Sequence, residues 1–416
     1  MGGTLARIAW RNIWRNRRRT LLTALAIAFG IGLIVITRGL QAGSYAQMID
    51  VAVRRSPGHI QVHAQGYWEK KDLAHTFPIA AVDTAGIAHI PGVAHVSPKL
   101  VVDALASVGE ENSTGAQVVG VIPSLERAMT VFGDSGIMEP GRFLTDGDTM
   151  GAVIGTTMAR NLHARVGDEL VLFTQARDGS VAAALVHVRG IFHVGELDMD
   201  GYLVMANLAL MQNILVAPGR ASIIALTVKD VRDVDRVRAE IEGLLATRGG
   251  SARWQVMTYR RLMPDIMQSI AFDHASGIIF LILLLVVIAF GILDTILMSV
   301  MERFHEFGVM MALGMRGRAI AAMVFVEGLL LAVIGLAVGN AIGWAANAWW
   351  QQHPTPLGGA AEAMESVGFH PELIALPDLG QQATWSVVVL CMTLAVALWP
   401  AVVAARFRPV EAIRQT

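Results

Sequence analysis

The stretch ASGIIFLILLLVVIAFGIL, residues Ala275 to Leu293, contains no charged side chain. A helix of roughly 20 apolar residues spans the core of a bilayer, and helices of soluble proteins rarely stay uncharged over this length. We therefore predict a transmembrane helix here, which continues after Asp294 to Met301. The alternative is a buried core helix, and the length of the run argues against it.

Three further stretches meet the same length criterion. They are Thr20–Thr37, a run from Ala319 past Trp350 that only Glu327 interrupts, and Gln381–Ala405. Together the four runs predict four membrane-spanning helices. Arginines precede the first run and no small-residue cleavage site follows it, so we interpret it as an uncleaved signal anchor.

The composition excludes several classes of protein. The chain has 416 residues, of which 54% are hydrophobic and 16% charged, with net charge −1 and mean hydropathy +0.51. An average soluble domain carries about 25% charged residues. The near-zero net charge excludes the broad basic surface of a nucleic-acid-binding protein. The single cysteine, Cys391, excludes a disulfide framework and a cysteine-based zinc cluster.

The arginines predict the orientation in the membrane. They gather before the first run, between the second and third runs, and after the fourth, whereas residues 351–382 contain neither Lys nor Arg. Because short positive segments stay in the cytoplasm, both termini and the loop of residues 302–318 are expected there. The expected location is the inner (cytoplasmic) membrane.

These observations divide the chain into segments. The predicted spans are residues 20–42, 273–301, 319–350 and 381–405. A large extracytoplasmic domain, residues 43–272, is inserted between the first and second spans. The other segments are a cytoplasmic interfacial helix (1–19), a cytoplasmic coupling loop (302–318), an extracytoplasmic loop (351–380) and a cytoplasmic tail (406–416).

Residues 43–272 have a globular composition with mixed α/β patterns. His59–His63 alternates polar and apolar side chains, which predicts a half-buried strand. Further β-rich runs are 117–122, 152–155, 169–173, 184–188 and 223–228, and residues 231–245 have helical spacing. His59 and His63 would share one face of their strand, but two nitrogens are a weak metal signal, so we favour surface histidines.

The N-terminal segment is amphipathic. Leu5, Ile8, Ala9 and Ile13 fall on one helical face, and Arg7, Arg11, Arg15 and Arg18 fall on another. This pattern favours a helix lying on the inner leaflet, with its arginines near anionic lipid. The alternative is a charge cluster that only sets topology.

The sequence lacks the motifs of common enzymes. It contains no Gly-x-x-x-x-Gly-Lys-Ser/Thr motif, so the chain is not expected to bind ATP through a P-loop. His305-Glu306 begins like a zinc-protease motif, but residue 309 is Val instead of His. We therefore expect no catalytic residues, no metal site and no cofactor on this chain.

The loop of residues 302–318 combines charged flanks with an apolar middle. Phe307, Met310, Met311 and Gly314 cluster at helical spacing, and Gly314 is a suitable C-cap. Such a helix suits a protein partner. A hairpin connector folded against the inner leaflet explains the pattern equally well.

Residues 293–335 resemble the FtsX-like permease domain of MacB/Lol-type ABC transporters. That family has a Glu-Arg-x-x-Glu-x-Gly-x-x-x-Ala-Leu-Gly loop, a glutamate early in the third helix and a closing Arg-x-x-Pro-x-Glu-Ala-Leu-Arg. This chain supplies Glu302, Arg303, Glu306, Gly308, Ala312, Leu313, Gly314, Glu327 and the segment Arg406–Arg414. Asp294 departs from the pattern, since the family more often has Asn there.

The resemblance implies a permease subunit that is driven by two separate ATPase subunits, which hold the ATP and Mg. A second permease copy or a sister chain would complete the complex. Expected cargo is a lipoprotein or another amphipathic molecule, extracted outward by mechanotransmission with membrane lipid and an extracytoplasmic carrier as further partners. The alternatives are MacB-like efflux of peptides or small molecules, and FtsX-like activation of an extracytoplasmic hydrolase.

Three groups of residues are candidate functional sites. For the ATPase-coupling loop we expect apolar anchors that fill a groove on the ATPase, namely Phe307, Met310, Met311 and Leu313. The charges at the rim are expected to be Glu302, Arg303, Glu306 and Arg316, and Gly308 and Gly314 complete the site. Gly335, Gly339 and Gly343 are spaced by four, which predicts close helix packing. Asp294 and Glu327 are intramembrane acids that either approach one another, with one protonated, or bond separately to neighbouring helices.

Overall fold

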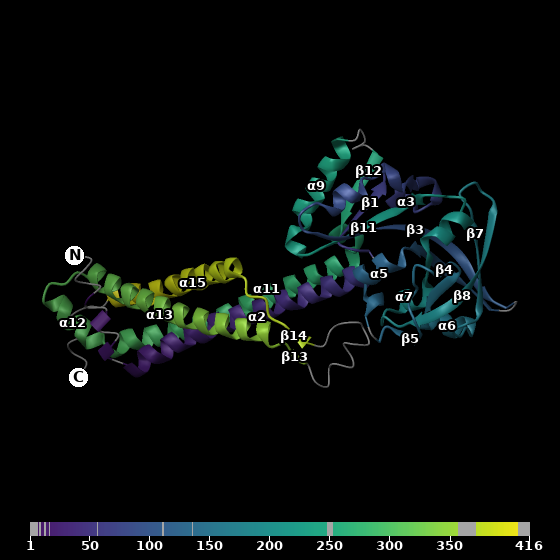
Figure 1. Cartoon of the computed structure of the whole chain (residues 1–416). Coiled ribbons are helices and arrows are strands. Elements are labelled where there is room, and N and C mark those ends of the chain that lie inside the picture. Colours follow the sequence, from purple (N-terminus) through teal and green to yellow (C-terminus); the bar gives the residue numbers. More distant parts are fainter. Residues whose placement is uncertain are drawn as a thin grey trace. The chain divides into compact units, whose positions relative to one another are not determined.

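The computed structural model describes residues 17–55, 57–109, 112–134, 136–247, 253–356 and 372–406, together with Arg7, Trp10, Arg11, Trp14 and Arg15. The described residues form two compact units (Figure 1). The helical unit contains the described residues up to Ala46, residues 269–356 and residues 372–406, and the sheet unit contains the described residues between 47 and 268.

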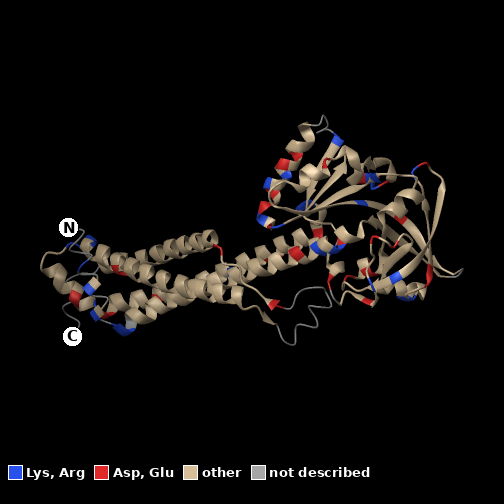
Figure 2. Cartoon of the chain, in the orientation of Figure 1, with Lys and Arg blue, Asp and Glu red and all other residues tan. Residues whose placement is uncertain are grey.

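The helical unit contains four helices that are long and apolar enough to cross a membrane. They are α2 (Arg17–Arg55), α11 (Pro264–Glu302), α13 (Gly317–Gln352) and α15 (Leu379–Ala405). Each contains one of the four apolar runs predicted to span. Charged side chains are sparse along these helices and gather around α12 (Phe304–Ala312) (Figure 2).

All four helices are longer than the predicted spans, and two of them extend far beyond theirs. α2 continues to Arg55 and α11 begins at Pro264. Pro57 disfavours helical backbone at the residue before it, and a proline is well tolerated in the first turn of a helix. The prolines therefore set where the helices end, whereas the apolar runs indicate only which part can lie in a membrane.

Glycines bring α2 and α13 into close contact. A Cβ atom on Gly339 would lie 2.2 Å from Ile31 Cγ2 and 2.3 Å from the carbonyl oxygen of Ala28. Gly335 and Gly343 also face α2. A Cβ atom on Gly335 would lie 2.7 Å from Ile27 Cβ, and a Cβ atom on Gly343 would lie 2.8 Å from Val35 Cβ. Small residues at a helix contact allow this approach, which increases van der Waals contact in lipid.

Gly339→Ala is expected to destabilise the helical unit by roughly 1–3 kcal/mol, because the new methyl group meets backbone that cannot move aside. The measurement is the thermal unfolding of the purified chain in detergent. Gly291→Ala is the matched control, since nothing lies within 4 Å of a Cβ atom there. Equal melting temperatures for the two variants would contradict the proposed packing.

The sheet unit is built on a ten-stranded sheet in the order β12-β1-β11-β3-β4-β9-β6-β8-β5, with β7 paired to β3 and β8. The strands are β1 (Ile60–Ala64), β3 (Val93–Val108), β4 (Asn112–Val121), β5 (Met138–Gly141), β6 (Gly151–Gly155), β7 (Glu169–Gln175), β8 (Val181–Phe192), β9 (Leu203–Asn207), β11 (Ile223–Val228) and β12 (Trp254–Thr258). A small sheet of this unit pairs β2 (Phe77–Pro78) with β10 (Arg220–Ala221). In the helical unit, β13 (Thr355–Pro356) pairs with β14 (Glu372–Leu373).

Short helices connect these strands. They are α3 (Tyr67–Lys70), α4 (Thr84–Ala88), α5 (Pro123–Met129), α6 (Thr156–Leu162), α7 (Leu197–Tyr202), α8 (Leu208–Ile214), α9 (Val234–Thr247) and α10 (Tyr259–Leu262), with 3₁₀ turns at Leu73–His75, Ile79–Ala81, Val131–Gly133 and Val231–Asp233. All six β-rich runs lie in strands or overlap them, and the run at 231–245 overlaps α9. The prediction of a mixed α/β domain is confirmed.

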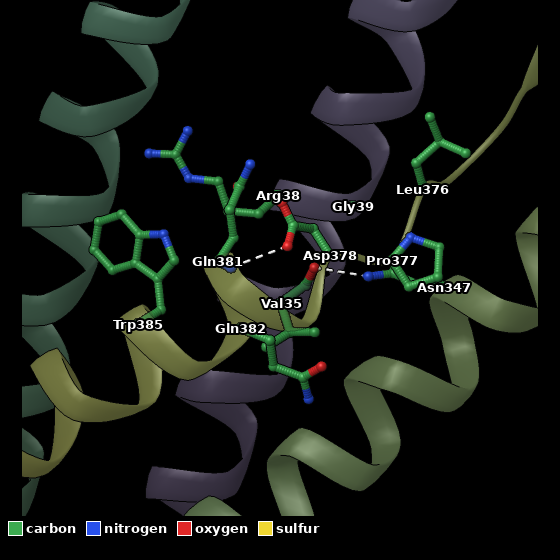
Figure 3. A pocket seen from close by; sticks show the side chains of 10 residues that line it. All are labelled: Val35, Arg38, Gly39, Asn347, Leu376, Pro377, Asp378, Gln381, Gln382 and Trp385. Carbon is green, nitrogen blue, oxygen red and sulfur yellow. Dashed lines mark hydrogen bonds between the residues drawn. The ribbon is translucent and has the colours of Figure 1, made fainter. Parts of the chain in front are cut away.

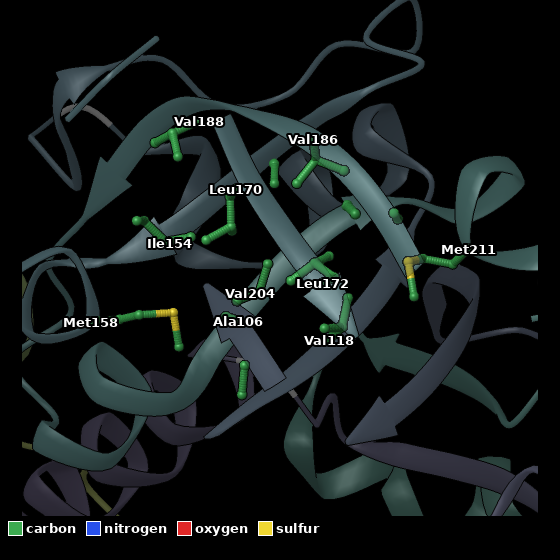
Figure 4. Close-up of a cluster of buried hydrophobic side chains, with 14 of the residues drawn as sticks. Ala106, Val118, Ile154, Met158, Leu170, Leu172, Val186, Val188, Val204 and Met211 are labelled. Atoms are coloured by element: carbon green, nitrogen blue, oxygen red, sulfur yellow. The ribbon is translucent and has the colours of Figure 1, made fainter. Parts of the chain in front are cut away.

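Six strands of the sheet close into a ring. Hydrogen bonds join β3 to β4, β4 to β9, β9 to β6, β6 to β8, β8 to β7, and β7 back to β3. Every strand of the ring contributes side chains to one buried cluster, and Met158 of α6 and Met211 of α8 join it (Figure 4). Closure removes unpaired strand edges, which would otherwise be exposed to other chains.

The long strand β3 belongs to both parts of the sheet. Its first half pairs with β11, which continues the sheet to β1 and β12, and its second half pairs with β4 of the ring. One face of the β12-β1-β11-β3 part is apolar. Ile60, Val62 and Ile224 on this face pack against Val237 and Ile241 of α9.

The opposite face of this part is polar, yet it is also buried. Successive side chains of a strand alternate between faces, and the strand register places Gln61 and His63 of β1 in the same rows as Ser97 and Lys99 of β3. His59, just before β1, is buried as well. The expectation of a half-buried strand with surface histidines is therefore wrong, because both faces of β1 are covered.

Hydrogen bonds and one ion pair compensate part of this polar burial. Lys99 Nζ lies 2.7 Å from Glu126 Oε1 of α5, and both side chains are almost fully buried. His63 Nε2 lies 2.7 Å from Gln61 Oε1, and the His63 ring stacks on Tyr67 at 5.2 Å between centroids. Buried polar groups without partners would be costly, so these contacts fix the side chains in place.

Burial lowers the pKa of His59 to about 4 and, with a smaller contribution from the Lys71 charge, lowers the pKa of His63 to about 4. A histidine in the unfolded chain has a pKa of about 6.5. Between these values the unfolded chain binds a proton and the folded chain does not. Stability is therefore lost as the pH falls from about 6.5 towards 4.

We expect the sheet unit to lose about 2 kcal/mol of stability per buried histidine when the pH falls from 7 to 5. The measurement is chemical denaturation of the full chain at both pH values, with unfolding monitored by tryptophan fluorescence. His63→Gln cannot titrate, so its loss between the two pH values should be smaller by about that amount. An unchanged pH dependence in this variant would show that His63 is not protonated on unfolding in this range.

Candidate functional site: the loop between the second and third spans

The loop folds into α12, a short helix with a well-defined end. Gly314 has φ +97°, a left-handed conformation that glycine adopts without strain. Its N–H donates to the Met311 carbonyl at 3.0 Å, and the Met315 N–H donates to the Met310 carbonyl at 3.0 Å. These two bonds form a Schellman motif, which satisfies the last carbonyls of the helix. Gly314 thus has the capping conformation expected of it.

One face of α12 packs against the spanning helices. Phe307 is fully buried in a cluster with Val300, Ile320 and Met323, and Gly308 is buried beside it. Met310, Met311 and Met315 are half-buried against the same cluster. Phe307 therefore cannot fill a groove on a partner protein, contrary to the sequence-based expectation.

The outward face of the loop is small and partly apolar. Leu313 is 84% exposed and Val309 is 40% exposed. Glu302, Ala312 and Arg316 are also exposed. Hydrophobicity alone cannot distinguish these two faces, because Phe307 and Leu313 are both large apolar residues at helical positions.

Four charged side chains form a cluster beside Phe307. The Arg303 guanidinium donates to both carboxylate oxygens of Glu327 on α13, at 3.0 and 2.9 Å, and lies 4.9 Å from the centre of the Phe307 ring. Arg303 also donates to Glu306 at 3.3 Å. Arg15, just before α2, donates to both oxygens of Glu306 at 2.5 and 2.6 Å. The cluster links three segments that are far apart in the sequence.

The separate bonding expected of the two intramembrane acids is found for Glu327, through this cluster, and not for Asp294. Glu327 bonds to Arg303, whereas Asp294 lies on the exposed side of α11. Outside the spans, the hydrogen bonds from Arg15 hold the pKa of the Glu306 carboxyl below its usual value. Glu306 therefore remains an anion at neutral pH.

A second polar group of residues lies towards the other end of the helical unit. Arg38 of α2 is buried, with its guanidinium 5.1 Å from the centre of the Trp385 ring of α15, and it donates to Gln41 at 2.6 Å. Gln41 and Tyr45 donate to Asp273 of α11 at 3.0 and 2.7 Å. The hydrogen bonds from Arg38 through Gln41 to Asp273 join α2 to α11, and the contact of Arg38 with Trp385 adds α15. This group was not expected from the sequence.

Arg38 also lines a small pocket between α2, α13 and α15 (Figure 3). Asn347 lines the opposite side, where its amide donates to the Val35 carbonyl at 2.8 Å. The Leu376 N–H donates to the Gly39 carbonyl at 2.9 Å, which anchors the segment that leads into α15. A side chain at position 39 would clash with Asn347, so glycine is needed there.

Much of the N-terminal segment and the closing motif lies outside the described residues. Arg7, Trp10, Arg11 and Trp14 are helical and exposed, while Leu5, Ile8, Ala9 and Ile13 are not described. The family-like ending after Arg406 is likewise outside the described part. Within the described ranges, no group of three or more His, Cys, Asp or Glu residues is arranged to hold a metal ion.

Two protein-family models match this chain. The MacB-like periplasmic core domain matches residues 20–244, which is more than half of the chain, and the FtsX-like permease C-terminal domain matches residues 278–408. The chain belongs to the MacB/FtsX-like family of ABC transporter permeases. Permeases of this family are multi-pass membrane proteins, in agreement with the four spans.

Several relatives match most of this chain in sequence. The lipoprotein-releasing system transmembrane protein LolC of Xylella fastidiosa is 25% identical over 414 residues, which cover 95% of this chain and 93% of LolC. An uncharacterised ABC transporter permease of Methanocaldococcus jannaschii is 25% identical and covers 80% of this chain and 81% of its own. The macrolide export ATP-binding/permease protein MacB of Paracoccus denitrificans is 26% identical over 79% of this chain, but the match spans 48% of MacB.

Among solved structures, the periplasmic region of MacB from Actinobacillus actinomycetemcomitans matches with a TM-score of 0.37 at 14% identity. The match covers 50% of this chain and 92% of that region.

Phe307→Ala is expected to destabilise the chain by about 3–5 kcal/mol, because it removes a fully buried ring and leaves a cavity. Leu313→Ala removes an exposed side chain and should change stability by less than about 0.5 kcal/mol. Thermal unfolding of both purified variants in detergent measures the difference. If Leu313→Ala were the more damaging of the two, the assignment of inward and outward faces would be reversed.

Proposed function

We propose that this chain is the permease subunit of an ABC transporter whose energy comes from two separate ATPase subunits. Membership of the permease family supports this, and so does the absence of a P-loop motif from the sequence. ATP and Mg would then bind to the ATPases. A second copy of this chain or a sister permease would complete the complex in the inner membrane, with both termini in the cytoplasm.

The outward face of α12 is the proposed contact with the ATPase. Leu313 carries this proposal, since its large apolar side chain is exposed at the tip of a loop in which Phe307 is buried and the methionines are half-buried. Val309 lies one turn earlier and Arg316 lies at the edge. An apolar centre with a charged rim is typical of a protein interface, where the buried centre supplies most of the binding energy.

The spanning helices supply a route for movement. α11 is one uninterrupted helix from Pro264 to Glu302, and α12 follows it directly after Arg303. α2 is likewise uninterrupted from Arg17 to Arg55. In our proposal, displacement of α12 by the ATPases moves these helices, and residues of the sheet unit at their far ends move with them. This is mechanotransmission without passage of cargo through a pore.

Outward extraction of a lipoprotein or another amphipathic cargo is the favoured activity. The match to LolC runs from end to end of both chains, whereas the match to MacB spans about half of MacB. Membrane lipid and an extracytoplasmic carrier would be further partners. MacB-like efflux and FtsX-like activation of a hydrolase are the alternatives. A neighbouring gene for a lipoprotein carrier, an adaptor or a peptidoglycan hydrolase would favour release, efflux or activation, respectively.

Leu313→Asp is expected to weaken binding of the ATPase by at least roughly ten-fold, because it places a charge at the apolar centre of the contact. Co-purification of the ATPase with the full chain in detergent measures this. Val181→Asp in the sheet unit is the matched control, because Val181 is 85% exposed and Leu313 is 84% exposed. Normal recovery of the ATPase with Leu313→Asp would remove α12 from the interface.

A further inference from the structure

The Arg303–Glu327 ion pair differs from the other charge contacts of the helical unit in its burial. The side chains of Arg303 and Glu327 are 6% and 12% exposed, whereas those of Arg15 and Glu306 are 56% and 42% exposed. Arg303 precedes α12 directly, and Glu327 lies on α13 almost three turns beyond its start. The pair therefore joins the loop helix to a spanning helix from within the protein.

We propose that Arg303 and Glu327 are positioning residues that fix α12 to α13, so that the two helices move as one body, and that neither residue contacts the ATPase. The sequence pattern places Arg303 at the rim of the ATPase contact. The burial of its side chain places Arg303 on the inward side of α12, away from the exposed face that carries Leu313. The inference rests on the proposed function only where it concerns transmission of movement from the ATPase. The joint between α12 and α13 is a property of this chain alone.

The geometry of the pair makes the joint stiff. Both carboxylate oxygens of Glu327 accept hydrogen bonds from one guanidinium nitrogen, and the Phe307 ring covers the guanidinium. Removing one partner of a buried pair is costly, because the charge that remains loses a strong interaction in a medium of low dielectric constant. Separation of α12 from α13 is therefore strongly opposed as long as both charges are present.

The packing around the pair acts in the same direction. Phe307 on α12 and Met323 on α13 belong to one buried cluster, and Met323 lies one turn before Glu327. The backbone between the helices contains the Schellman motif at Gly314, which fixes how the chain leaves α12. The ion pair is thus the polar part of a contact whose apolar part is Phe307.

The exposed half of the cluster has a different role. Water and salt screen the Arg15–Glu306 contact, and exposed ion pairs contribute little to stability. This contact can open and close without moving α12 away from α13. Arg15→Gln is therefore the matched control, because it removes an arginine–glutamate pair from the same cluster without disturbing a buried charge.

The test measures the distance between α12 and α13 in the purified full chain, without the ATPase. Spin labels on Ala312→Cys and Val333→Cys, in a Cys391→Ser background, report the distribution of distances between the two helices. Both positions are exposed. We expect a narrow distribution in the parent chain and in Arg15→Gln, and a distribution about twice as broad in Glu327→Gln and in Arg303→Gln.

A double variant separates a direct joint from a general loss of folding. If the two residues act through one another, Arg303→Gln/Glu327→Gln broadens the distribution no more than either single change. Additive broadening would overturn the proposal, as would a narrow distribution in both single variants. Should the glutamine variants fail to give monodisperse protein, Arg303→Lys is the alternative. It keeps the charge but loses the planar guanidinium, which bonds to Glu327 through Nη1 and to Glu306 through Nε, so it must broaden the distribution to support the joint.

Binding of the ATPase gives an independent readout. Glu327→Gln should retain co-purification of the ATPase within about two-fold, because no contact residue is changed, while cargo-dependent stimulation of hydrolysis falls. A loss of co-purification as large as that of Leu313→Asp would place the pair in the interface and overturn the positioning role. If no ATPase binds the parent chain, the proposed function fails, but the distance measurement still decides whether the joint exists.

Discussion

Lipid gives two apolar helices no hydrophobic reason to associate, so the helical unit depends on how closely α2 and α13 approach. At Gly339 the backbones are so near that even one methyl group would meet the Ala28 carbonyl. The contact recurs at Gly335 and Gly343, so it holds α2 and α13 together over several turns. The segment leading into α15 is anchored to α2 at Gly39, and α12 is joined to α13 by Arg303 and Glu327.

Features that depend on local chemistry could be predicted from the sequence. Four uncharged runs indicate four spans, because the hydropathy and length of a run do not depend on the rest of the fold. The β-rich run at 223–228 is likewise a strand with the predicted bounds. The end of α2 and the start of α11 were not predicted, because Pro57 and Pro264 determine them and the apolar runs do not. The 16-residue strand β3 was missed because Ser97, Pro98 and Lys99 interrupt its apolar pattern.

Features that depend on tertiary contacts could not be predicted. Arg303 and Glu327 meet only because α12 folds back towards α13, and neither residue alone indicates the other as its partner. Phe307 and Leu313 are equally apolar, so only packing shows which of them is inward. In the same way His63 looks like a surface residue on an alternating strand until a second layer covers it.

The shared strand β3 has a mechanical consequence for the sheet unit. Its first half is hydrogen-bonded into the four-stranded part and its second half into the closed ring, without a break in the backbone. Tension between the two parts therefore runs along covalent bonds instead of crossing a side-chain interface. The hydrogen bonds on either side of β3 are then strained together in shear, and not broken one at a time. A force that displaces one part of the sheet therefore displaces the other part by almost the same distance.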